Sequence, residues 1–86
     1  LGRNRFVRNV LIALGNARDR QHKHVAERLL EDESPIVRLA AVWALSRLAD
    51  PSGFAILYQS RYDTETDPDV RAEWDVAREE KQNEQA

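Results

Sequence analysis

Hydrophobic side chains recur every three to four residues along most of the chain, with polar side chains between them. This spacing is typical of amphipathic helices, because an α-helix makes one turn in about 3.6 residues. The clearest stripe consists of Val37, Ala41, Leu45 and Leu48. Similar stripes predict helices up to Gly15, over residues 21–31 and 52–62, and from Pro68 onward. No strand-like alternation appears, so the prediction is an all-α protein of about five helices.

Residues that favour helix ends flank these stripes. Ser34-Pro35, Asp50-Pro51 and Asp67-Pro68 each place a capping oxygen before a proline at the first helical position. Proline is tolerated there because its missing N–H would have no partner within the helix. Gly15 is predicted to end the first helix, since glycine adopts the left-handed cap conformation readily, and Asn16 is interpreted as part of that cap.

The stripes are also repeated. The dipeptide Val-Arg opens three of them, at 7–8, 37–38 and 70–71, so the copies are spaced by 30 and 33 residues. A period of this size indicates paired helices that stack into a solenoid. The predicted framework shared by the repeats is Val7, Val37, Arg38, Val70, Arg71 and Trp74.

The period divides the chain into units. The repeats are predicted at about 1–16, 21–49 and 52–80, followed by a polar tail at 81–86. The first repeat is incomplete, with one helix rather than two, and part of its apolar surface would then be exposed. We therefore expect the chain to be the C-terminal piece of a longer protein, and to self-associate through its first helix.

The arginine of each Val-Arg pair has two interpretations. A side chain that recurs in every copy is expected to hold neighbouring repeats together, by pairing with an acidic residue such as Asp32 or Asp67. This interpretation is favoured for Arg38 and Arg71. For Arg8 the structural interpretation and a role in binding a partner are equally favoured.

The middle copy, residues 32–45, has an acidic turn followed by Val-Arg, two alanines and a leucine. It resembles the HEAT-like repeats of the type found in phycobiliprotein lyases. The first copy, Arg-Asn-Arg-Phe-Val-Arg-Asn-Val-Leu-Ile-Ala-Leu-Gly-Asn at 3–16, resembles the C-terminal HEAT-like region of bacterial epoxyqueuosine reductases. That resemblance extends over about residues 2–50.

The resemblance to these reductases implies a parent enzyme that makes queuosine at the wobble position of tRNA. The family uses cobalamin and two 4Fe–4S clusters, which other domains hold. For this segment the resemblance implies no catalytic residue and no cofactor. It implies instead that the repeats adjoin upstream catalytic domains of the same chain and help to bind the tRNA anticodon stem-loop.

Length and composition restrict the alternatives. The chain has 86 residues, enough for a single domain, and no cysteine, which excludes disulfides, thiolate metal sites and a cysteine nucleophile. The longest apolar run, Val10 to Leu14, is too short to span a bilayer. No signal-peptide pattern opens the chain, so we expect a cytoplasmic protein.

Charge is distributed unevenly, although the net charge is only −2. Residues 1–30 carry seven basic and two acidic side chains, whereas residues 61–86 carry four basic and nine acidic ones. Basic side chains bind nucleic-acid phosphates by releasing counterions. The candidate RNA-binding residues are Arg3, Arg5, Arg8, Asn9, Arg18, Arg20 and Lys23. The alternatives are solvated surface charges, internal ion pairs, and a protein–protein scaffold without any role in RNA binding.

Other candidate sites are weaker. Trp43 lies off the apolar stripe of its helix, where it would either stack on a base or, as we favour, pack against the next repeat. His22 and His24 point to nearly opposite sides of a helix, and no third ligand completes a metal site. No base is spaced to activate a serine, so no catalytic residue is predicted.

Overall fold

The computed structural model describes residues 2–85 and confirms an all-helical solenoid. Two short 3-10 turns, Arg20–His22 and Tyr62–Thr64, precede α2 and α5, and the described part of the chain contains no strand. No helix in it is long and apolar enough to cross a membrane. The five helices are α1 (Gly2–Ala17), α2 (Lys23–Leu29), α3 (Pro35–Leu48), α4 (Pro51–Arg61) and α5 (Pro68–Gln85).

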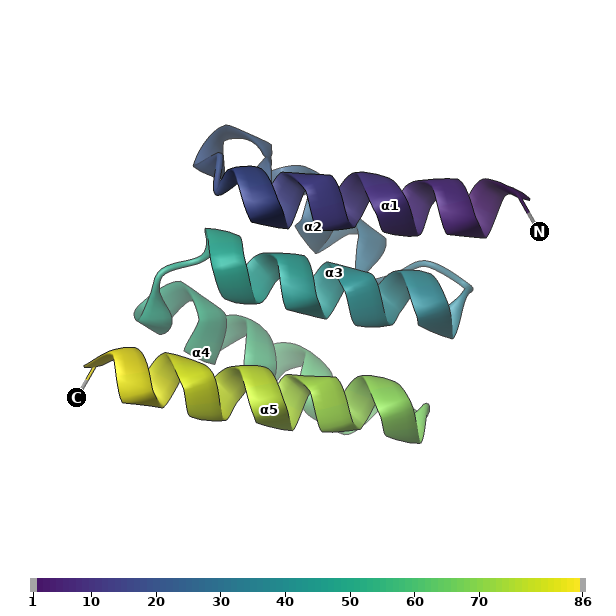
Figure 1. Cartoon of the computed structure of the whole chain (residues 1–86). Coiled ribbons are helices and arrows are strands. Elements are labelled where there is room, and N and C mark those ends of the chain that lie inside the picture. The colour runs from purple at the N-terminus through teal and green to yellow at the C-terminus, as the bar shows by residue number, and fades with distance from the viewer. Residues whose placement is uncertain (1, 86) are drawn as a thin grey trace.

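The helices form two layers. Figure 1 shows α1, α3 and α5 side by side in one layer and running in the same direction, with α2 and α4 behind them. The helix α3 packs against α1, α2 and α5, and α4 packs against α5. The molecule therefore measures 40 × 28 × 16 Å, with its shortest dimension about two helices thick. This is the arrangement of helical hairpins that the sequence period predicts.

The apolar core lies between the layers. The predicted stripe Val37, Ala41, Leu45 and Leu48 is fully buried. Phe54 of α4 and Trp74 of α5 are also buried, with ring centroids 5.4 Å apart. Because burial of one large apolar side chain contributes roughly 1.5–3 kcal/mol, these residues dominate the stacking of the repeats.

Helix starts follow the predicted capping chemistry at two of three positions. The Asp50 carboxylate accepts a hydrogen bond of 2.7 Å from Gly53 N–H, and the Asp67 carboxylate accepts one of 3.1 Å from Val70 N–H. At the start of α3 the Ser34 hydroxyl makes no capping hydrogen bond. There the Asp32 carboxylate accepts a hydrogen bond of 3.0 Å from Ser34 N–H, so the stabilising side chain lies two residues before Ser34.

The prediction that Gly15 caps the first helix is wrong. The helix α1 continues to Ala17, and the left-handed residue is Arg18, with φ of 53°. Gly15 is buried in the helix, and a Cβ atom there would lie 2.5 Å from Trp43 Cζ3. The glycine therefore serves the close approach of α1 to α3, and Asn16 is an exposed residue of the helix rather than a cap.

The helix α5 also extends further than expected. The last repeat was predicted to end at about residue 80, whereas the helix continues to Gln85. Lys81 continues the buried stripe of Val70, Trp74 and Ala77, and its side chain is 9% exposed. A lysine tolerates this position because its aliphatic stem covers apolar surface while its ammonium reaches Glu84, 3.5 Å away. Residues 81–85 thus belong to the last helix rather than to a separate tail, and residue 86 lies outside the described residues.

Candidate functional site

The predicted basic residues lie at one end of the molecule. Arg5 and Arg8 are exposed on α1, Arg18 directly follows that helix, and Arg20 lies in the next 3-10 turn. Lys23, at the start of α2, has its ammonium 3.9 Å from Glu27, a long surface pair that holds the lysine only weakly. These side chains therefore face solvent with most of their charge uncompensated.

Arg3 differs from the other candidate RNA-binding residues because it forms a close, two-bond ion pair within the fold. Its guanidinium donates to both carboxylate oxygens of Asp32, at 2.6 and 3.0 Å. This hydrogen bonding holds the pKa of the Asp32 carboxyl below its usual value. Arg3 thus links α1 to the turn before α3, which leaves less of its charge for a partner. Asn9 is exposed beside Arg8 and accepts a hydrogen bond of 3.3 Å from it.

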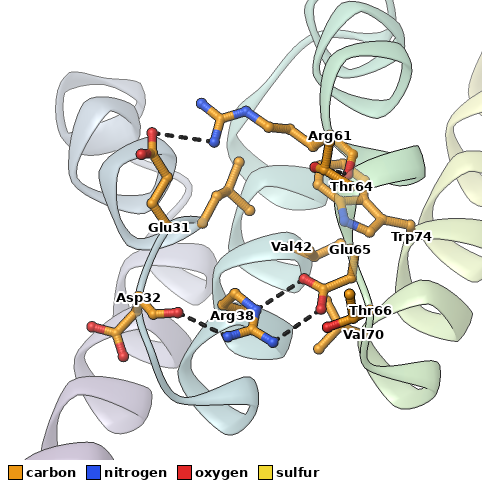
Figure 2. Close-up of a pocket in the computed structure, with 11 residues that line it drawn as sticks. Glu31, Asp32, Arg38, Val42, Arg61, Thr64, Glu65, Thr66, Val70 and Trp74 are labelled. Carbon is orange, nitrogen blue, oxygen red and sulfur yellow. Dashed lines mark hydrogen bonds and ion pairs between the residues drawn. The ribbon is translucent and has the colours of Figure 1, made fainter.

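Arg38 joins the two complete repeats, as Figure 2 shows. Its guanidinium donates to both carboxylate oxygens of Glu65, at 2.9 and 3.0 Å, and to the carbonyls of Asp32 and Glu33, at 2.9 and 3.0 Å. Burial alone would raise the pKa of Glu65, but the hydrogen bonds from Arg38 and from Asp67 N–H outweigh it and lower the pKa. The expected carboxylate partner was Asp32 or Asp67, and the structure places Glu65 there instead.

Arg71 binds the turn of its own repeat, and its hydrogen bonds go to carbonyls rather than to the acidic side chain that was expected. It donates to the carbonyls of Tyr62 at 2.9 Å and Glu65 at 3.1 Å, and its guanidinium lies 4.1 Å from the centroid of the Tyr62 ring. Both arginines therefore fix the turn that precedes their own helix. Arg8 has only the bond to Asn9 among the described residues and remains exposed.

The cleft around Arg38 is a junction between repeats. It has a volume of about 290 Å³ and is bordered by a second ion pair, in which Arg61 lies 3.3 Å from Glu31 (Figure 2). Because Arg38 and Arg61 already pair with carboxylates, these contacts serve the fold. Within residues 2–85 no group of three potential metal ligands comes together. His22 instead lies 3.8 Å from Asp19.

A second surface was not predicted from the sequence. A groove of about 470 Å³ opens between α1 and α3, with an apolar lining formed mainly by Ile12, Ile36, Leu39 and Trp43. Arg8 and Glu73 of α5 lie at its edges. In the sequence, the indication of this surface was a set of apolar residues that lie outside the stripes predicted to be buried. One of them, Ile36, is 57% exposed in the structure.

Trp43 forms one wall of this groove. It was expected to pack against the next repeat, but its ring lies against Gly15 in the preceding one. The Arg47 guanidinium covers the ring at 5.3 Å from its centroid. Nearby, burial raises the pKa of Glu73 and the charge of Glu80 raises it further, while Arg47 acts in the opposite direction.

Comparison with known proteins gives one match. A family model for HEAT repeats matches residues 5–75. No curated protein and no solved structure matches the chain significantly.

Proposed function

Because the chain belongs to the HEAT-repeat family, we propose that it is an accessory domain of an epoxyqueuosine reductase whose basic end helps to hold the tRNA anticodon stem-loop. HEAT repeats commonly mediate protein interactions, and a rigid array of helices can equally present charge to RNA. The sequence of residues 3–16, which resembles that reductase family, supports the finer assignment. Activity of this kind would place the protein in the cytoplasm.

The observation that carries the proposal is the segregation of charge between the two ends of the solenoid. Residues 1–30 have a net charge of +5, and α1 contains three arginines and no acidic residue. The last helix, α5, contains six acidic and three basic side chains. An RNA strand is therefore attracted to α1 and α2 and repelled from α5, which would orient it on the domain.

This segment would serve positioning rather than chemistry. It has no cysteine, so it cannot supply the thiolate ligands of a 4Fe–4S cluster. The clusters and the cobalamin of such a reductase would be held in upstream catalytic domains, which are the proposed intramolecular partner. The repeats would act by fixing the RNA backbone at a set distance from those domains.

A salt titration tests the RNA contact. Labelled anticodon stem-loop RNA is titrated with the protein at several salt concentrations, and log K is plotted against log salt. Four neutralised phosphates give a slope of about −3 to −4. Each of the charge reversals Arg5→Glu, Arg20→Glu and Lys23→Glu should reduce both the affinity for RNA and the steepness of its salt dependence.

Arg78→Glu is the matched control, because it reverses one exposed charge on α5, away from the basic end. It should change the affinity for RNA much less than Arg5→Glu. Circular dichroism establishes that each variant is folded. The proposal fails if no binding is measured at low salt, or if Arg78→Glu weakens binding as much as the three basic-end variants do.

A further inference from the structure

The apolar groove between α1 and α3 is separate in character from the basic end. Ile12 and Ile36 in its lining are 37% and 57% exposed, and Trp43 and Leu39 are half-buried. No lining residue comes from α2 or α4, the two helices of the second layer (Figure 1). Single exposed apolar residues are ordinary, whereas a contiguous apolar groove with charged edges marks an interaction site.

The edges of the groove carry opposite charges. Arg8 lies on the α1 side and Glu73 on the α5 side. The α1 edge belongs to a helix with arginines and no acidic residue, whereas on α5 burial and a nearby second carboxylate, Glu80, raise the pKa of Glu73, and Arg47 of α3 acts in the opposite direction. The complementary occupant is apolar along its centre, acidic along one flank and basic along the other.

The backbone around the groove favours a helical occupant. The walls are helices, and beyond the first turn of α3 their N–H and C=O groups are bonded within each helix. An extended peptide would bury its own backbone groups against apolar side chains without partners, at substantial cost. A helix satisfies its backbone internally and can insert its side chains between two parallel helices.

The length of the groove sets how many side chains it takes. Ile36 and Trp43 are seven residues apart on α3, which corresponds to about 10 Å, or two helical turns. A helix lying along the groove presents three apolar side chains over that distance, at i, i+4 and i+7.

We propose that this groove binds an amphipathic helix of a partner protein, with apolar side chains against Ile12, Ile36 and Trp43, an acidic flank on Arg8 and a basic flank on Glu73. The site goes beyond the proposed RNA contact and does not depend on it. RNA is the less suitable occupant, because the lining is mainly apolar and Glu73 repels phosphates from the α5 side.

The probe is an 18-residue helical peptide with a leucine stripe, glutamates along one flank, lysines along the other and no aromatic residue. Trp43 reports binding, since its partly exposed side chain loses water when covered, while Trp74 is 1% exposed and contributes a constant signal. The peptide should shift the emission to shorter wavelengths with a Kd on the order of 10–100 µM. Peptides with lysine on both flanks, or glutamate on both, should bind roughly threefold more weakly.

Two isoleucines provide matched variants. Ile36→Glu should weaken binding about tenfold or more by placing a charge on the apolar lining. It should remain folded, because Ile36 is exposed and an acidic residue is favourable in the first turn of α3. Ile56→Glu replaces a 66% exposed isoleucine on α4, in the other layer, and should leave the Kd unchanged.

Several results would overturn the proposal. One is the absence of an emission shift up to about 1 mM peptide, and another is an equal loss of affinity in both isoleucine variants. Sedimentation that shows a dimer broken by Ile36→Glu would identify a second copy of this chain as the occupant. Competition by the anticodon stem-loop for the Trp43 signal would identify RNA. Arg5→Glu and Arg20→Glu should weaken RNA binding without changing the peptide Kd, so the two proposals fail independently.

Discussion

Replacing Gly15 by alanine tests how closely α1 approaches α3. The new Cβ would lie 2.5 Å from Trp43 Cζ3 and 3.1 Å from two further ring atoms. In an exposed helix the same change would stabilise by about 0.5–1 kcal/mol, because alanine loses less backbone entropy. Here, forcing a methyl group into packed space costs typically 1–3 kcal/mol, since the indole must shift.

The clash should exceed the gain in helix propensity, so Gly15→Ala should lower the free energy of unfolding by about 1 kcal/mol. For a domain of this size that corresponds to a decrease in Tm of about 4–8 °C. Urea unfolding followed by circular dichroism measures the change. Because Trp43 also lines the groove, its fluorescence should change in the folded variant.

A second background separates packing from propensity. In Trp43→Leu the ring is gone, and Gly15→Ala should become neutral or stabilising. The double-mutant cycle should thus give a coupling of about 1 kcal/mol or more between the two positions. If Gly15→Ala stabilises the protein that retains Trp43, or has the same effect in both backgrounds, the indole ring does not limit how closely α1 approaches α3.

Three further predictions concern the turns between helices. Glu65→Ala leaves the largely buried Arg38 guanidinium without its carboxylate and should destabilise by about 1–3 kcal/mol, measured by urea unfolding. Asp50→Ala removes the cap of α4 and should cost about 1 kcal/mol, whereas Asp50→Asn should retain most of it. The pKa values of Glu65 and Asp32 are lowered in the fold, so the unfolded state takes up protons first and the stability that these groups contribute is lost as the pH falls below about 4. Urea midpoints at pH 7 and pH 3 check this, and Glu65→Ala should show the smaller difference between them.

The helix starts were predictable because their chemistry is local. At Asp50-Pro51 and Asp67-Pro68 the capping carboxylate and the N–H that it accepts from lie within three residues of each other. Gly15 looked like a helix end for the same local reason. Its actual role depends on Trp43, 28 positions away, and only the register of α1 against α3 shows that.

The candidate site was predictable to a smaller extent. The exposure of Arg5, Arg18 and Arg20 agrees with the uneven charge of the sequence. Which carboxylate Arg38 would bind was not evident, because several acidic residues lie in the neighbouring turns. The path of the Tyr62–Thr64 turn decides it, since that turn brings Glu65 to the guanidinium.

The Val-Arg dipeptide shows how one repeated motif serves two purposes. Arg38 and Arg71 each bind carbonyls of the turn that precedes their helix, so their charge is used within the fold. Arg8 has the same place in its repeat but bonds only Asn9 among the described residues, at the edge of the apolar groove. Arg38→Ala should therefore reduce stability. Arg8→Ala should leave stability unchanged and weaken binding of the helical peptide that carries glutamates along one flank and lysines along the other. Measuring urea unfolding and peptide affinity on both variants separates the structural from the recognition role, and equal losses of stability would show that the motif has a single purpose.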